Sequence, residues 1–211
     1  VTGVQTCALP IFGLRHPLFR EAIKRMGVLY PDTELILEEL QSGLQLDAVR
    51  TGKLDAGFVY LTEDASEPAT SLPNARSLNE LRSLTLEEGG IGLAMPRDHS
   101  LVGSETLDLA DLSHEGFIIV GPSLANAYFP FQPRIVQQVS NISTQINLIS
   151  VGMGVGLVVV SPSLQFPGDI QVVPLRGIEY RSQFRLIWRQ DATNPILQNF
   201  IMIVREMTKH C

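Results

Sequence analysis

The glycine-rich run Gly152-Met153-Gly154-Val155-Gly156 is the stretch whose residue types come nearest to a phosphate-binding loop. In a dinucleotide-binding fingerprint, a strand runs into the glycines and a helix follows them, so that the helix N-terminus meets the pyrophosphate. Here the order is reversed, because the pattern predicts a helix at 143–151 before the glycines and a strand at 157–160 after them. A phosphate would face the negative end of the helix dipole. We therefore expect a structural helix-to-strand turn, and no cofactor.

Ser123 lies in a near match to a second chemical motif, the nucleophile elbow G-x-S-x-G of α/β-hydrolases. The motif begins at Gly121 after a predicted strand, but Ala125 stands where its last glycine belongs. Residues 126–130 do not have the pattern of the helix that should follow, and the general base would have to be His210, the penultimate residue. A turn in which Ser123 is solvated or lines a cleft explains the segment better. We predict no catalytic residue and no enzyme activity.

Metal-binding patterns are also missing from the sequence. The four histidines are His16, His99, His114 and His210. Their spacing is not that of metal ligands. The two cysteines, Cys7 and Cys211, lie near opposite ends of the chain, which argues against a disulfide scaffold and a cysteine-built metal site. Glu38 and Glu39 are neighbours in a predicted strand, so they point to opposite faces and cannot act as a catalytic pair. No metal site is expected.

Ser42 is the side chain best placed to contact a ligand. It follows a predicted strand over 34–40 and begins a predicted helix, and Gln45 three residues later completes a capping-box pattern. Ligands of open parallel sheets bind at this edge, where strands end and helices start. The free N–H groups of a helix N-terminus also suit an anion. Two roles for Ser42 therefore stay open, a helix cap alone and a ligand contact.

Bulk composition narrows the class of protein. The chain has 211 residues, 45% hydrophobic and 18% charged, which is enough for one large domain or two small ones with a real core. The net charge of −6 provides no basic footprint for nucleic acid. No run reaches the roughly 18 apolar residues of a membrane span. We therefore expect no membrane partner.

The order of predicted elements is typical of an α/β fold with parallel strands. Apolar periodicity predicts a helix over 17–29, a strand over 34–40, a helix from Ser42 and a strand over 56–61. Gly52 is expected to end the second helix in the left-handed conformation. Further strands are predicted at 81–86, 91–95, 116–120, 135–139, 157–160, 170–175 and 184–188, and a last helix starts at Asn194-Pro195. No internal repeat is evident, and we place the last helix on the first of two α/β blocks, which meet near Gly90.

Five segments in this order resemble the effector-binding domain of LysR-type transcriptional regulators. They are Tyr30-Pro31-Asp32 with the strand after it, 52–59, 94–101, the run 148–160 with its pattern G-x-G-[IV]-x-[LF]-[VL], and Trp188-Arg189 followed by Pro195, Leu197 and Phe200. The resemblance covers the chain from about Phe12 to its C-terminus.

The resemblance implies two Rossmann-like α/β subdomains joined by crossover strands, a fold of the periplasmic-binding-protein type II kind. Residues 12–90 with 190–211 would form regulatory subdomain I, and 91–189 would form subdomain II. The crossovers would lie near 91–96 and 184–189. The family function that follows is a cytoplasmic, ligand-sensing domain that binds a small-molecule effector in the cleft between the subdomains and controls transcription. The full-length regulator would be a homo-oligomer.

Effector-binding residues carry over by position from the family. They are Gly13, Leu14, Ser42, Gly43, Tyr60, Gly121 and Pro122. Together with backbone N–H groups, Ser42 and Tyr60 would suit a small carboxylate or an aromatic acid. A transport-type solute-binding protein of the same architecture is the alternative function. A helix-turn-helix upstream would favour the regulator, and a signal peptide would favour the transport protein.

The sequence departs from the family in three places. The N-terminal winged helix-turn-helix is missing, so we expect no direct DNA contact from this stretch of chain. Residues 1–11 resemble the in-frame translation of a sequencing adapter and replace most of the first strand; an ordinary N-terminal strand is the alternative. Only eleven residues separate Gly121 from Pro133, where the family has an additional amphipathic helix. We expect this loss to open one wall of subdomain II and to remove part of the dimer surface.

Overall fold

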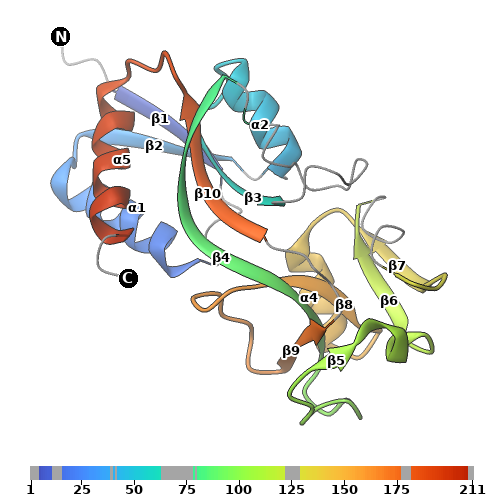
Figure 1. The fold of residues 1–211 in the computed structure, drawn as a ribbon. Coiled ribbons are helices and arrows are strands. Elements are labelled where there is room, and N and C mark those ends of the chain that lie inside the picture. Colours follow the sequence, from blue (N-terminus) through green and yellow to red (C-terminus); the bar gives the residue numbers. More distant parts are fainter. Residues whose placement is uncertain are drawn as a thin grey trace. The chain divides into compact units, whose positions relative to one another are not determined.

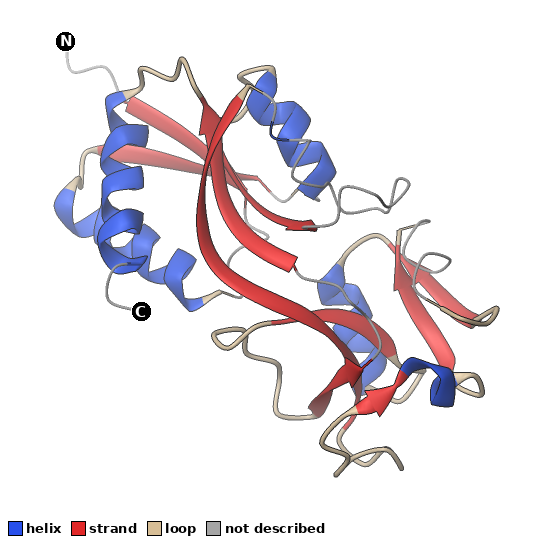
Figure 2. Cartoon of the chain, in the orientation of Figure 1, coloured by secondary structure: helices blue, strands red, loops and turns tan. Residues whose placement is uncertain are grey.

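The structure is a computed structural model that describes residues 5–10, 16–38, 40, 42–62, 78, 80–121, 129–176 and 182–208. The described chain forms two compact units (Figures 1 and 2). Unit 1 holds the described residues up to Thr62, those from 78 to Glu88, and those from Gln183 onward. Unit 2 holds Gly89–Ser182. None of the described helices is both long and apolar enough to cross a membrane.

Unit 1 is an α/β layer built largely from the N-terminal part of the chain. Its elements are β1 (Gln5–Pro10), α1 (Pro17–Leu29), β2 (Thr33–Glu38), α2 (Ser42–Arg50), β3 (Ala56–Thr62), the first half of β4 (Leu81–Pro96), most of β10 (Ser182–Arg189) and α5 (Pro195–Thr208). β1 and β2 pair in parallel, and β10 lies between β3 and β4. α1 lies beside α5 (Figure 1). The strand–helix–strand order predicted for this part is confirmed.

The helices of unit 1 follow from their apolar spacing. Phe19, Ala22 and Met26 recur every three or four residues of α1, and all three are buried. α5 buries a matching stripe of six apolar side chains. Between these helices and the sheet, the ring of Phe58 on β3 packs edge-on against Phe19 at 4.6 Å and against Phe200 at 5.9 Å. Such contacts between aromatic rings stabilise the core beyond the burial of their area.

Unit 2 contains the second half of β4 and a second strand–helix–strand segment. Its elements are β5 (Leu107–Asp108), the 3-10 helix η3 (Leu109–Leu112), β6 (Gly116–Val120), β7 (Arg134–Val139), α4 (Ile142–Ser150), β8 (Gly156–Val160) and β9 (Ile170–Arg176). β8 and β9 both pair antiparallel with β4, β9 pairs in parallel with β5, and β6 pairs in parallel with β7. The buried face of α4 packs Ile146 and Ile149 against Ile118 and Val158.

The two strands predicted at 81–86 and 91–95 are in fact one continuous strand, β4, of sixteen residues. The prediction missed residues 87–90, where two glycines lower the local strand propensity. Gly89 instead allows a close approach of two backbones: a Cβ atom at this position would lie 2.1 Å from the carbonyl oxygen of Val160 on β8. The origin of residues 1–11 in an adapter stays a prediction.

The glycine run has the structural role that its order predicted. α4 ends at Ser150 and β8 begins at Gly156, so a helix precedes the glycines and a strand follows them. Gly152 takes a φ of +78°, which is the left-handed conformation of a helix end. Gly154 passes so near β6 that a Cβ atom would lie 2.4 Å from the carbonyl oxygen of Gly116.

The substitution Gly154→Ala tests this packing. The added methyl group meets backbone that cannot turn aside, so we expect the free energy of unfolding to fall by about 1–3 kcal/mol in urea denaturation. Gly168→Ala is the matched control, because no heavy atom lies within 4 Å of its Cβ position. Its free energy of unfolding should stay within about 0.5 kcal/mol of the wild type. Equal effects of the two substitutions would contradict the packing role of Gly154.

Candidate functional site

The candidate site is built around the first turn of α2. Ser42 is the first residue of this helix and is only 5% exposed. Its Oγ accepts a hydrogen bond of 3.2 Å from the N–H of Tyr60 on β3. The start of α2 is therefore tied to the neighbouring strand through the very residue that the sequence analysis singled out. Among the described residues, the hydroxyl hydrogen of Ser42 has no acceptor.

The capping box predicted from Ser42 and Gln45 does not form. Ser42 lies inside the helix, and its side chain turns toward β3 and not toward the N–H of Gln45. Gln45 is fully buried, and its Nε2 donates a 2.8 Å hydrogen bond to the carbonyl oxygen of Leu40, just before the helix. Gln45 therefore holds the backbone that leads into α2. We call this contact the Gln45 clamp.

The Gln45 clamp also explains a glycine on β3. A Cβ atom at Gly57 would lie 3.2 Å from Oε1 of Gln45 and 3.0 Å from the side chain of Ile187. Oε1 itself has no hydrogen-bond partner among the described residues. The absence of a side chain at Gly57 lets the buried amide of Gln45 lie flat against the strand.

Tyr60 connects the site to an aromatic cluster in the core of unit 1. The residue is 7% exposed, and its ring lies 4.8 Å from the ring of Phe184 on β10. Phe184 also stacks on Phe58 at 5.7 Å and on the imidazole of His16 at 4.6 Å. The ring of Tyr60 thus packs against a residue on the neighbouring strand β10, and that residue joins it to the cluster.

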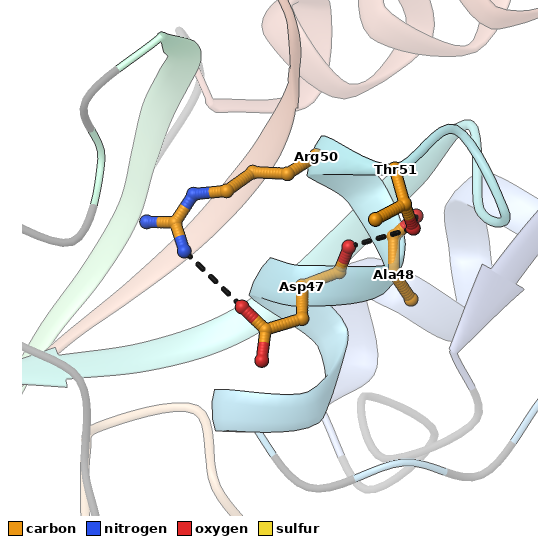
Figure 3. A network of polar contacts seen from close by, with 4 residues as sticks. All are labelled: Asp47, Ala48, Arg50 and Thr51. Carbon is orange, nitrogen blue, oxygen red and sulfur yellow. Dashed lines mark hydrogen bonds and ion pairs between the residues drawn. The ribbon is translucent and has the colours of Figure 1, made fainter.

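The far end of α2 is fixed by polar contacts of its own (Figure 3). The Thr51 hydroxyl donates to the carbonyl oxygens of Asp47 at 2.8 Å and of Ala48 at 3.2 Å, and both oxygens also accept a backbone N–H at 3.0 Å. Arg50 pairs with the Asp47 carboxylate at 3.2 Å. The next residue, Gly52, has a φ of +73°, as predicted for the helix end. With both ends fixed, α2 presents its first turn in a defined position.

The other predicted effector residues are only partly within the described chain. A Cβ atom at Gly43, the second residue of α2, would meet no heavy atom within 4 Å. The same holds for Gly121 at the end of β6 in unit 2, where φ is +69° and the N–H donates to the Val139 carbonyl at 2.9 Å. Gly13, Leu14 and Pro122 lie outside the described residues, as does Ser123. The structure therefore brings Ser42 and Tyr60 into contact, with Gly43 next to Ser42 in the helix, and the effector-binding role of the whole set stays a prediction.

Gln145 is a residue that the sequence analysis missed. It occupies the fourth position of α4, as Gln45 does in α2. Its Nε2 donates to the carbonyl oxygen of Ile118 at 2.6 Å, and a Cβ atom at Gly156 on β8 would lie 2.6 Å from that nitrogen. The shared spacing from Gln to a left-handed glycine, Gly52 or Gly152, is the signal that could have revealed a repeated strand–helix–strand unit.

Charged clusters of the kind that hold metal ions do not occur in the part of the chain that the structure describes. No group of three or more His, Cys, Asp or Glu side chains is close enough there to bind one. His99 lies in the loop after β4, with its Nε2 3.4 Å from the Glu115 carboxylate. What the described site offers is a hydroxyl, an aromatic ring and a helix N-terminus, a set suited to binding and not to covalent chemistry.

Comparison with known proteins identifies the class to which this fold and site belong. The family model of the LysR substrate binding domain matches residues 8–209. The chain belongs to the LysR substrate-binding domain family. Its relatives include the HTH-type transcriptional regulator AlsR of Bacillus subtilis, 25% identical over 197 residues, and the Hca operon transcriptional activator HcaR of Escherichia coli, 26% identical over 208 residues. The match covers 89% of this chain and 60% of AlsR, and 94% of this chain and 61% of HcaR.

Solved structures agree on the fold. The C-terminal domain of a probable LysR family regulator from Rhodococcus has a TM-score of 0.71 at 18% identity, over 96% of this chain and 99% of that one. The predicted fold class is confirmed: it is the periplasmic-binding-protein type II-like fold with two α/β subdomains. The relatives are named as transcriptional regulators and not as enzymes, and the transport-type alternative is not favoured. The chain spans about 60% of the length of the curated relatives it matches.

Ser42→Ala tests the bond between α2 and β3. Loss of the hydroxyl removes the acceptor of the Tyr60 N–H, so we expect the free energy of unfolding to fall by about 0.5–1.5 kcal/mol in urea denaturation. The control is Ser143→Ala in the first turn of α4, where the side chain is exposed. It should change the free energy of unfolding by less than about 0.5 kcal/mol. Stability equal to wild type in Ser42→Ala would show that the hydrogen bond does not hold α2.

Gln45→Glu tests the Gln45 clamp. A carboxylate would face the Leu40 carbonyl oxygen as a second acceptor and would be buried without a partner. We expect the free energy of unfolding at pH 7 to fall by about 3 kcal/mol, as for an uncompensated buried charge. Gln137→Glu on the exposed surface of β7 introduces the same charge at no such cost. Similar losses in both variants would mean that net charge, and not the clamp, is responsible.

Proposed function

We propose that this chain senses a small-molecule effector and that the whole regulator changes transcription when the effector binds. Membership of the LysR substrate-binding domain family is the observation that carries this proposal. The chain covers about 60% of its curated relatives, so we assign contact with DNA to a part of the protein outside this stretch. The intact regulator is then a homo-oligomer that works in the cytoplasm.

The effector contacts that we propose in unit 1 are Ser42, Gly43 and Tyr60. Three features support them. The hydroxyl of Ser42 accepts one hydrogen bond from Tyr60 and keeps its own hydrogen for a further acceptor. Gly43 leaves open space beside the backbone at the start of α2. The ring of Tyr60 is fixed by Phe184, so it contributes a defined surface. Gly13, Leu14, Gly121 and Pro122 complete the proposed set on the ground of family resemblance alone.

The chemistry at the start of α2 favours a small carboxylate as the effector. The first N–H groups of a helix have no acceptor within the helix, and the helix dipole places partial positive charge at that end. A carboxylate accepts hydrogen bonds from such N–H groups and from a hydroxyl. An aromatic acid would in addition find a ring surface at Tyr60.

Thermal unfolding in the presence of acetate, succinate or benzoate tests this proposal. We expect at least one of these carboxylates to raise the unfolding temperature of the chain, because a ligand that binds only the native state stabilises it by about 2.7 kcal/mol at a hundred times its Kd. Ser42→Ala should weaken binding by about 10- to 150-fold in Kd, since it removes a hydrogen bond to a charged group worth about 1.5–3 kcal/mol.

The neutral amides acetamide, succinamide and benzamide are the matched control ligands. They have nearly the same size and lack the charge, so they should leave the unfolding temperature unchanged at the same concentration. If amides and acids stabilise the chain equally, the site does not select for a carboxylate. If the acids bind Ser42→Ala as tightly as the wild type, Ser42 serves only the fold.

A further inference from the structure

His16 contacts three elements of unit 1 at once. Its side chain is 3% exposed; Nδ1 accepts a hydrogen bond of 3.3 Å from the N–H of Leu18 in α1, and Nε2 lies 2.7 Å from the Glu87 carboxylate on β4. The ring stacks on Phe184 of β10, with the centroids 4.6 Å apart. Because Nδ1 is an acceptor, the proton of the neutral ring lies on Nε2 and is donated to Glu87. The imidazole is therefore fixed in position and in tautomer.

Both long-range partners of His16 lie where their strands leave unit 1. The division between the units falls after Glu88 on β4 and before Gln183 on β10. Glu87 immediately precedes the first of these residues, and Phe184 immediately follows the second. β4 and β10 are neighbours in the sheet. The imidazole of His16 thus contacts both of the strands that connect the units. Each contact lies one residue from the last residue that the strand contributes to unit 1.

The same contacts continue from His16 to Ser42. Phe184, on which the imidazole stacks, lies 4.8 Å from the ring of Tyr60. The N–H of Tyr60 in turn donates to Oγ of Ser42. Packed side chains and hydrogen bonds of this kind carry energetic coupling between separated positions when one of the contacts can be made or broken. The substitution Ser42→Ala breaks one contact of this series, the hydrogen bond between Tyr60 and Ser42.

We propose that His16 is a positioning residue, through which the state of the Ser42–Tyr60 pair is transmitted to the two connecting strands. An effector that accepts the Ser42 hydroxyl hydrogen would polarise the hydroxyl, strengthen its bond from the Tyr60 N–H and shift the Tyr60 ring against Phe184. That shift changes the stacking surface of the imidazole that holds Glu87. This proposal rests on the proposed function only in taking Ser42 and Tyr60 as residues that contact the effector. The contacts from His16 to Ser42 are present without any bound molecule.

His99 provides a matched control in unit 2. Its Nδ1 accepts a hydrogen bond of 3.3 Å from the N–H of Leu101, and its Nε2 lies 3.4 Å from the Glu115 carboxylate. The local pattern is therefore the same as at His16. None of the described polar or ring contacts of His99 is to β10, and Glu115 does not lie on a connecting strand.

Amide hydrogen exchange of the whole chain without added ligand tests the proposal. The variants are Ser42→Ala, His16→Asn and the double variant. Asparagine is among the best helix caps, so His16→Asn keeps the cap of α1 and removes only the bond to Glu87 and the stack on Phe184. We expect each single variant to lower the protection of the amides at 82–88 and 183–188. If the two effects were independent, the double variant would lower protection by the product of the single effects. We expect its effect to be at least about fivefold smaller than that product, which is the lower end of typical coupling between sites.

The control cycle combines Ser42→Ala with His99→Asn. These effects should multiply within about twofold, because distant residues without shared partners act independently. If the effects of Ser42→Ala and His16→Asn also multiply, or if His16→Asn exchanges like the wild type, His16 is only a helix cap and the proposal is wrong. Should His16→Asn fail to fold by far-UV circular dichroism, Glu87→Ala, which removes the acceptor of the Nε2 hydrogen, replaces it and the same outcomes decide. Since no effector is added, the result is independent of whether a carboxylate binds.

Discussion

A single strand, β4, has to serve two hydrophobic cores, and the rest of the molecule is arranged around this constraint. Its second half is buried without alternation from Ile91 to Met95, because Leu93 and Met95 pack into one cluster of buried residues and Ala94 into another. Its first half, next to β10 in unit 1, mixes exposed and half-buried positions. A strand that is covered on both faces is expected to be apolar throughout, and one with a solvated face is not. The change in pattern along β4 therefore marks the change of unit.

Glycines make this double role possible. Gly89 and Gly92 lie where β8 and β9 approach β4 most closely, and a Cβ atom at Gly92 would lie 2.7 Å from the side chain of Val160. The sequence predicts two strands here, at 81–86 and 91–95, so that Gly89 falls between them and Gly92 falls inside the second. Whether a glycine interrupts a strand or admits a neighbouring backbone depends on what lies beside it, which only the paired strands decide.

Local patterns carried most of the fold that could be predicted from the sequence. The bounds of α1 follow from Pro17 and from the apolar spacing behind it, and the left-handed glycines at 52 and 152 follow from helix ends. The polar contacts between distant parts of the chain could not be predicted this way. Nothing near Ser42 in the sequence indicates that its hydroxyl accepts from Tyr60, eighteen residues later, or that His16 meets Glu87. From the sequence alone, a side chain such as Gln45 has several possible hydrogen-bond partners, and only the pairing of the strands decides among them.

At the candidate site, too, the local pattern could be predicted from the sequence and the long-range contacts could not. Ser42 could be found because a helix start after a strand is where open sheets bind ligands, but its capping partner was assigned wrongly. A cap takes its hydrogen bond from the helix that it begins. Ser42 takes it from the neighbouring strand, so it links two elements and is not replaceable by any good capping residue. For that reason its chemistry can be separated from simple helix stability.

The repeated strand–helix–strand segment explains why ligand chemistry is expected at α2 and not at α4. Both helices carry a buried glutamine at their fourth position and end at a left-handed glycine. They differ at their first turn. Asn141 caps α4, and its Oδ1 accepts from the Thr144 N–H at 2.8 Å. This N–H in the first turn of α4 is therefore already bonded within the protein. In α2 the hydroxyl of Ser42 is turned toward β3 and keeps its hydrogen for another acceptor. The same strand–helix–strand arrangement thus occurs in both units, and the anion binding that we propose for α2 rests on this difference at its first turn.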